Sequence, residues 1–199
     1  MCFALRKQEL RENRLSSEVR TEYANMFRRG WELIRKLPSA EQRGDKPLGW
    51  FAKRHVKAAK ELFDKCYALE PDDSACLWAL GKLEQAIANH VNALEWFEKA
   101  LEQQRDNLEL IREAAYSAMV LGRAEQSEKL CRQAVDLEPK SPDLMANYAL
   151  ALLLNQEGKR ALGVATNAFR LNPEEGFSRE VLAYVKKVVD GKEDYPEHL

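Results

Sequence analysis

The sequence predicts an all-α fold of repeated helix pairs, and three observations support this prediction. Small, apolar and proline positions recur every 34 residues. Residues that favour helix N-termini recur at the same interval. The composition, with 45% hydrophobic and 32% charged residues, is typical of helical proteins rich in Ala, Leu, Glu, Lys and Arg. A period between about 20 and 50 residues indicates a solenoid or array, and 199 residues suit one domain, with room for an appendage.

Four columns keep the 34-residue period across the middle of the chain. They are two columns of mainly small residues, one that begins with aromatic residues, and one of proline. In chain order the members are Ala59, Ala93, Ser127 and Ala161; Phe63, Phe97, Cys131 and Ala165; Cys66, Ala100, Ala134 and Ala168; and Pro71, Arg105, Pro139 and Pro173. Because four columns rarely share one period by chance, each period is predicted to be one helix–turn–helix unit.

These residues resemble the tetratricopeptide repeat, whose units place a large apolar residue, Leu-Gly, an alanine, an aromatic residue and a proline in fixed order. The departures are Arg105 for proline, Cys131 and Ala165 for the aromatic residue, and Glu84 for tyrosine. The resemblance covers roughly residues 48–175. It implies a right-handed α-solenoid of three full helix pairs, with a partial N-terminal unit and a C-terminal capping helix.

The turns and helix contacts follow the same period. Asp73, Asn107 and Ser141 are predicted N-caps, and Pro142 suits the first helical position after Ser141. Small residues are expected to face each other where paired helices approach closely. The expected pairs are Gly81 with Ala93, Ala115 with Ser127, and Ala149 with Ala161.

The chain is predicted to divide into six segments. These are a charged arm (1–15), an N-terminal helix and loop (16–47), a partial repeat unit (48–73), three units (74–173), a capping helix (174–190) and a disordered tail (191–199). Ser16 or Ser17 can cap the first helix, and Pro38 ends it. This helix is either the first half of the partial unit, displaced by a long inserted loop, or a separate flanking helix.

Composition and charge limit the functional classes. The four cysteines are scattered, so we expect reduced thiols and a cytoplasmic protein. No segment approaches the roughly 18 apolar residues of a membrane span, and no membrane partner is expected. Residues 1–60 hold 15 Lys and Arg against 7 Asp and Glu, whereas the remainder is acidic.

Catalytic patterns are missing from the sequence. The histidines His55, His90 and His198 show no zinc-ligand spacing with cysteine or carboxylate residues. The sequence contains no phosphate-binding loop, dinucleotide-binding turn or nucleophile elbow. We therefore predict a protein that is not an enzyme and has no cofactor, metal or catalytic residues.

The resemblance implies a concave surface lined by the first helix of each unit, where a peptide or helix of another protein would bind. Spacing places eight candidate residues on it: Trp78, Lys82, Arg112, Glu113, Tyr116, Met119, Asn147 and Leu150. Arg and aromatic residues often dominate binding energy, and Met adapts to different partners. The alternative is that Trp78 and Tyr116 pack between units or under the N-terminal helix. Some members of this family bind the C-terminal carboxylate of a chaperone peptide with Asn and Lys side chains. This chain has Glu113 and Asp143 at those places, and their negative charges would repel such a carboxylate, so we do not expect that ligand.

Three other functions stay open at this stage. The basic N-terminal third, with Arg28, Arg29, Lys53, Arg54 and Lys57 as candidates, could bind nucleic acid or an acidic partner, although a solvated helix face is the simpler explanation. The repeat number resembles that of chaperones that cradle partner segments. The apolar face of residues 19–37, with Phe27 and Trp31, could instead pack on a second copy and form a homo-oligomer.

Overall fold

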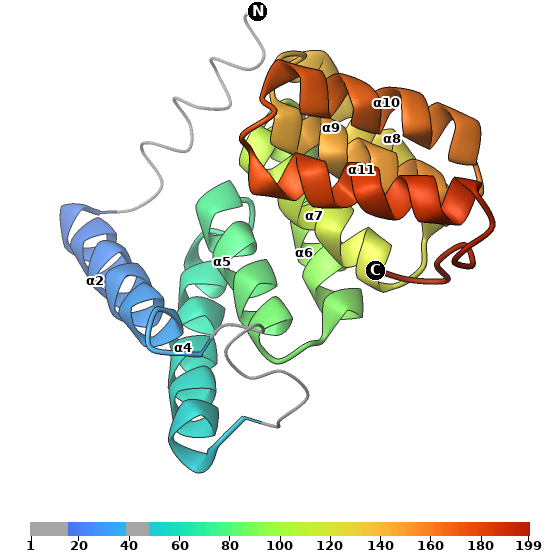
Figure 1. Cartoon of the computed structure of the whole chain (residues 1–199). Coiled ribbons are helices and arrows are strands. Elements are labelled where there is room, and N and C mark those ends of the chain that lie inside the picture. The colour runs from blue at the N-terminus through green and yellow to red at the C-terminus, as the bar shows by residue number, and fades with distance from the viewer. Residues whose placement is uncertain (1–15, 39–47) are drawn as a thin grey trace, which may run out of the picture. The chain divides into compact units, whose positions relative to one another are not determined.

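The computed structural model describes residues 16–38 and 48–199, so the predicted charged arm and most of the inserted loop lie outside the described residues. The described residues are helical, without strands (Figure 1). The helices are α2 (Ser17–Ile34), α4 (Trp50–Leu69), α5 (Ser74–Ala86), α6 (His90–Gln103), α7 (Leu108–Val120), α8 (Ala124–Leu137), α9 (Pro142–Leu154), α10 (Gly158–Leu171) and α11 (Gly176–Val189). They fall into two compact units that divide the chain after Ile87.

The predicted N-caps are confirmed at three helix starts. Asp73 accepts from the backbone N–H of Cys76 at 3.1 Å, and Asn107 accepts from that of Leu110 at 3.2 Å. Ser141 caps α9 in the same way, with Pro142 at the start of the helix. Each cap satisfies an N–H group that has no partner inside the helix, which typically stabilises by about 1 kcal/mol.

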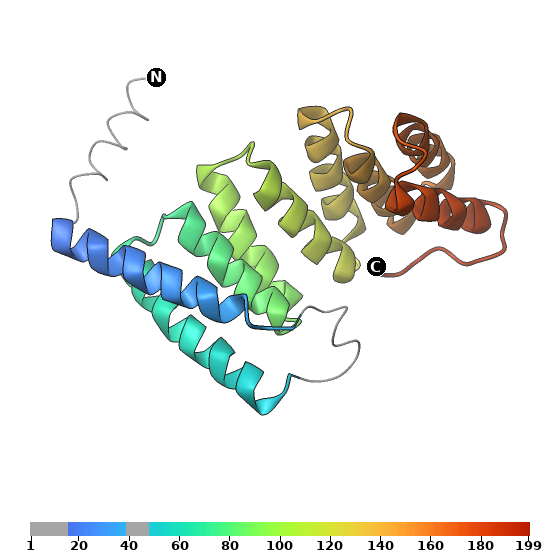
Figure 2. The ribbon, with the colours of Figure 1, turned by 60° about the vertical axis from the view of Figure 1, so that its left-hand side comes forward.

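In the first unit, α2 and α4 run antiparallel and side by side (Figure 2). Gly30 is the buried residue of α2, and a Cβ atom added to it would lie 2.8 Å from the Phe63 ring. Phe27 packs edge-on against the same ring, with centroids 5.7 Å apart. The glycine therefore permits the close approach of the two helices, and α2 supplies the first half of the N-terminal helix pair.

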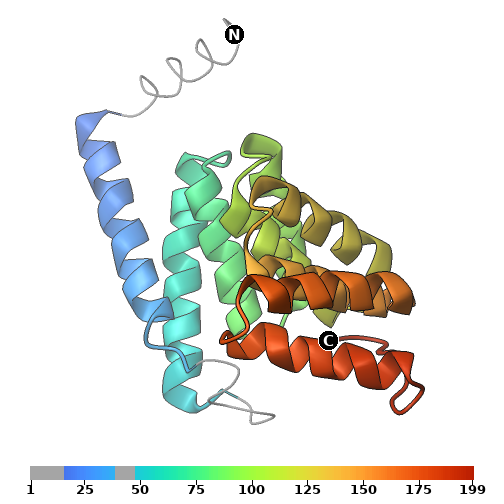
Figure 3. The ribbon, with the colours of Figure 1, turned by 45° about the horizontal axis from the view of Figure 1, so that its top comes forward.

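In the second unit, each helix from α6 to α11 packs on its neighbour along the chain, and α11 also contacts α9; Figure 3 shows α10 beside α11. The predicted small residues Ala115, Ser127, Ala149 and Ala161 are all buried at these contacts. Helix α9 is apolar almost all round because α8, α10 and α11 cover it. The pair Gly81 and Ala93 spans the two units and stays a prediction.

The turns that follow α5, α7 and α9 each contain one residue with a left-handed backbone. These residues are Ala88, Gly122 and Gln156, with φ angles of 61°, 67° and 60°. They are again 34 residues apart, a regularity that the residue types Ala, Gly and Gln do not indicate. Only Gly122 is the residue type that adopts this conformation without steric cost.

The tail after Gly191 differs from the predicted disordered segment. Its Leu199 N–H donates to the Met119 carbonyl at 3.2 Å, and the Leu199 side chain packs against the core of the second unit. Lys187 and Glu193 form an ion pair of 2.8 Å where the tail begins. A Cβ atom at Gly122 would lie 2.5 Å from the Glu197 carbonyl oxygen, so this glycine leaves the space that the tail occupies.

Candidate functional site

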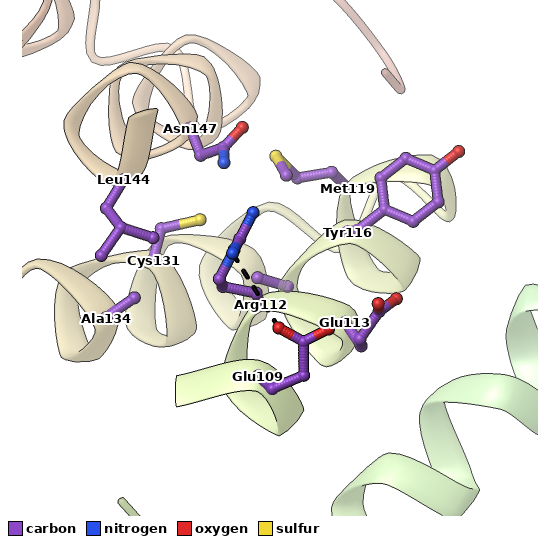
Figure 4. A pocket seen from close by; sticks show the side chains of 10 residues that line it. Glu109, Arg112, Glu113, Tyr116, Met119, Cys131, Ala134, Leu144 and Asn147 are labelled. Carbon is purple, nitrogen blue, oxygen red and sulfur yellow. Dashed lines mark ion pairs between the residues drawn. The ribbon is translucent and has the colours of Figure 1, made fainter. Parts of the chain in front are cut away.

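A pocket of about 240 Å³ opens in the second unit between α7 and α9, and α8 forms its floor (Figure 4). Helix α7 contributes most of the wall, because residues spaced by three and four project from one face of a helix. The lining residues are Glu109, Arg112, Glu113, Ala115, Tyr116, Met119, Cys131, Ala134, Leu144 and Asn147.

Five of the eight residues predicted for the groove line this pocket. They are Arg112, Glu113, Tyr116, Met119 and Asn147. Leu150 lies on α9 and is half-buried, but it does not line the pocket. Trp78 and Lys82 belong to the first unit, so their place in a shared groove stays a prediction.

The pocket floor consists of small side chains. Cys131 is 2% exposed and Ala134 is 3% exposed, and the Cys131 sulfur faces the same space as the Met119 sulfur (Figure 4). Phe63 and Phe97 occupy the column of Cys131 in the preceding units and are fully buried. The departure of Cys131 from the aromatic column is visible in the sequence, but a cavity beside it could not be predicted from that departure alone.

Charged residues stand at the pocket rim. Arg112 and Glu109 pair at 3.9 Å across one helical turn, and both side chains are about half exposed. Such exposed pairs contribute little stability, about 0.5 kcal/mol or less, so Arg112 can exchange this partner for a ligand. Glu109 was missed in sequence reasoning, although its position one turn before Arg112 on a predicted helix was a usable signal.

Tyr116 exposes 45% of its surface beside the pocket. Its ring contacts the His90 ring edge-on, with centroids 5.6 Å apart. Burial lowers the pKa of His90, and the His90 Nδ1 atom is buried with no hydrogen-bond partner among the described residues. The neutral imidazole therefore supports one side of Tyr116 and leaves the other available.

Cys131 is the one thiol in the pocket lining. Burial raises its pKa to about 12, so the thiol stays protonated near neutral pH. A protonated thiol is a poor nucleophile and metal ligand. Within residues 16–38 and 48–199, no three His, Cys, Asp or Glu side chains are grouped closely enough to hold a metal ion. The pocket lining can therefore contact a ligand through its shape and its charged side chains.

Trp78 has an aromatic neighbour within the first unit. Its ring lies on that of Trp31 in α2, with centroids 4.8 Å apart. Phe27, the other residue suggested for self-association, packs on Phe63. Both rings on the apolar face of α2 therefore have aromatic neighbours inside the first unit.

None of the helices in the described ranges combines the length and the hydrophobicity that a membrane span requires.

Comparisons with known proteins give structural likenesses. No protein-family model and no curated protein matches the sequence significantly. Among solved structures, a tetratricopeptide repeat protein from Parabacteroides merdae superposes with a TM-score of 0.70 at 16% identity, over 86% of this chain and 61% of that protein's length. YrrB, described as a TPR protein with an unusual peptide-binding site, gives 0.62 at 16% identity, over 73% of this chain and 75% of YrrB.

A third likeness covers most of both proteins. TTC0263, described as a thermophilic TPR protein from Thermus thermophilus, gives a TM-score of 0.56 at 19% identity, over 85% of this chain and 84% of TTC0263. The described helices, their N-caps and the 34-residue columns agree with this architecture. The chain therefore has the tetratricopeptide-repeat fold.

Proposed function

We propose that this protein is a non-enzymatic interaction module that holds a peptide or helix of a partner protein against α7 and α9. The observation that carries the proposal is the pocket, in which Arg112, Tyr116 and Met119 lie together beside an apolar floor. Arginine and aromatic residues supply much of the binding energy at protein interfaces, and methionine adapts to different surfaces.

Two further observations support the proposal. Tyr116 is a large aromatic residue that stays almost half exposed beside the pocket. YrrB, which is similar in fold, is described as having a peptide-binding site. Because one fold serves many functions, the residues of the pocket support the proposal more strongly than this likeness does.

The described cysteines Cys66, Cys76 and Cys131 are free and buried, which agrees with a reducing, cytoplasmic location.

The test is affinity purification from the native cell, with the bound proteins identified by mass spectrometry. The variant Arg112→Ala with Tyr116→Ala is expected to lose the specific partner. A matched control, Arg170→Ala with Phe177→Ala, removes an exposed arginine and an exposed aromatic residue away from the pocket. Recovery of the same partners by the wild type and the pocket variant would refute the proposal.

A second candidate function rests on the first turns of α4. Trp50 is 63% exposed and Phe51 is 72% exposed, and the Arg54 guanidinium lies 4.8 Å from the centroid of the Trp50 ring. Lys53 and Lys57 are also exposed there. Exposed aromatic rings among cations suit an acidic protein or single-stranded nucleic acid.

The second candidate is tested with single-stranded oligonucleotides in a gel-shift assay. Binding through phosphates should weaken steeply as salt rises, and Lys53→Ala with Arg54→Ala should reduce the salt slope. Absence of any retention at low salt would exclude nucleic acid as the partner of this surface.

A further inference from the structure

We propose that residues 195–199, here called the strap, are an internal occupant of the surface beside Met119, and that a partner peptide extending along α7 must displace them. The inference rests on the proposed function and adds both a regulation of that site and the kind of segment that fits next to the pocket. It starts from the hydrogen bond between the tail and Met119, which is a residue of the pocket lining.

The end of the strap reaches this surface through its backbone and through a leucine. The Met119 carbonyl accepts from the Leu199 N–H at 3.2 Å and from the Gly122 N–H at 3.0 Å. The Leu199 side chain is half-buried and packs against the core cluster that includes Ala115, Met119 and Cys131. These three residues also line the pocket. Leu199 and a ligand in the pocket therefore draw on the same apolar cluster.

Two glycines leave room for the path of the strap, which returns from α11 toward the end of α7 (Figure 1). Gly122 lies in the turn after α7, and a Cβ atom there would lie 2.5 Å from the Glu197 carbonyl oxygen. Gly158 begins α10, and the Tyr195 hydroxyl occupies the space that a Cβ atom would take there. The strap therefore crosses two helix pairs of the second unit on a path that these residues keep clear.

The strap is held by few contacts, so it can be released. Tyr195 exposes 40% of its surface, and the side chains of Glu197 and His198 are also exposed. Beyond Glu193, the Leu199 N–H donates the one hydrogen bond that joins the tail to another backbone group of the described residues. Segments with few buried contacts open at a low free-energy cost. Because the strap is tethered beside its seat, a millimolar effective concentration keeps even weak contacts formed.

The contacts of the strap specify what a competing partner segment must provide. It needs a backbone N–H for the Met119 carbonyl and an apolar side chain of about the size of leucine for the cluster, as residue 199 supplies them. A ligand confined to the part of the pocket near Arg112 would not meet the strap. Apparent affinity falls with the fraction of molecules whose site is open, so a seated strap weakens the binding of a longer segment.

The Met119 methyl resonance in the NMR spectrum of the full chain tests whether the strap is seated. Leu199→Ala removes the apolar contact and should shift this resonance. His198→Ala is the matched control, because it removes an exposed side chain from the neighbouring position and should leave the resonance unchanged. The same Met119 signal in Leu199→Ala and in the wild type would overturn the seat.

A synthetic peptide with the sequence of residues 191–199 and blocked ends tests the competition. It is added to the wild type and to the variant Tyr195→Ala with Leu199→Ala, and the Met119 methyl signal follows its binding. The variant should bind the peptide about tenfold or more tightly than the wild type, in which the strap competes. Equal binding by both proteins, or no binding to the variant at millimolar peptide, would overturn the inference.

The native partner separates this inference from the proposed function. The variant Tyr195→Ala with Leu199→Ala should bind that partner about tenfold more tightly than the wild type, and His198→Ala should match the wild type. If the strap variant shows no gain while Arg112→Ala with Tyr116→Ala loses the partner, displacement is wrong and the proposed function stands. If the peptide competes as expected but the Arg112 and Tyr116 variant keeps the partner, the proposed function is wrong and the seat of the strap stands.

Discussion

Trp31 of α2 and Trp78 of α5 lie ring against ring, with centroids 4.8 Å apart and planes inclined by 34°. Tyr23 of α2 adds a second attachment, because its hydroxyl donates to Asp73, the N-cap of α5. Helix α2 is thus held to both α4 and α5 within the first unit. Trp78, for which the sequence suggested either a place in the groove or packing under the N-terminal helix, lies against α2 within the first unit.

Replacing Trp31 with alanine should destabilise the protein by about 1–3 kcal/mol, because a half-buried aromatic contact is lost. The control is Trp50→Ala, which removes a tryptophan of 63% exposure and should change stability by about 0.5 kcal/mol or less. Urea denaturation measures the free energy of unfolding of both variants. Equal midpoints for the wild type and Trp31→Ala would mean that α2 is not held by this contact.

Ala149 and Ala161 are fully buried on α9 and α10, which pack on each other. Ala149→Leu should therefore overpack this helix pair and cost about 1–3 kcal/mol, seen as a lower melting temperature. Ala183→Leu on the exposed face of α11 is the matched control, with little change expected. An unchanged transition for Ala149→Leu would contradict the close approach.

Gln156 holds a φ angle of 60°, in the turn position that Gly122 occupies one repeat earlier. Gln156→Gly should stabilise by up to about 1 kcal/mol, since the relief of backbone strain exceeds the added freedom of the unfolded chain. Gly122→Ala should do the reverse, because its Cβ atom would also meet the Glu197 carbonyl at 2.5 Å. Thermal denaturation should show a higher melting temperature for Gln156→Gly and a lower one for Gly122→Ala. A lower melting temperature for Gln156→Gly would contradict the expected strain.

Burial lowers the pKa of His90 below its ordinary value of 6.5. Between the two pKa values the unfolded chain binds more protons than the folded chain, so stability falls as the pH falls below about 6.5. His90→Gln cannot titrate and should lose this part of the pH dependence. Unfolding free energies measured between about pH 7.5 and 5.5 test it. Parallel curves for the two proteins would show that His90 does not contribute.

The helix pairs could be predicted from the sequence because their determinants are local and periodic. The capping groups of Asp73, Asn107 and Ser141 act within one helical turn. The observed helix bounds follow the 34-residue columns closely, from α5 through α11. The residues with a left-handed backbone recur at the same period. This could not be predicted at Ala88 and Gln156, because neither residue type is typical of such a turn.

The pocket residues were predicted in part. Arg112, Tyr116 and Met119 follow from helical spacing on one face of α7. Trp78 could not be assigned in this way, because its contact with Trp31 depends on how α4 and α5 pack against α2, which lies far away in the chain. The contact of the tail with Met119 joins two segments far apart in the chain, and no local pattern indicates it.

The sequence by itself determined the α-helical repeat, its period and its caps, since hydrogen bonding and side-chain periodicity within about 34 residues settle them. Only the tertiary structure decided which departures from the repeat matter. Cys131, which takes the place of an aromatic residue in its column, lines the pocket between α7 and α9. Whether a missing ring becomes a cavity depends on what packs over it, and that packing joins helices distant in the chain.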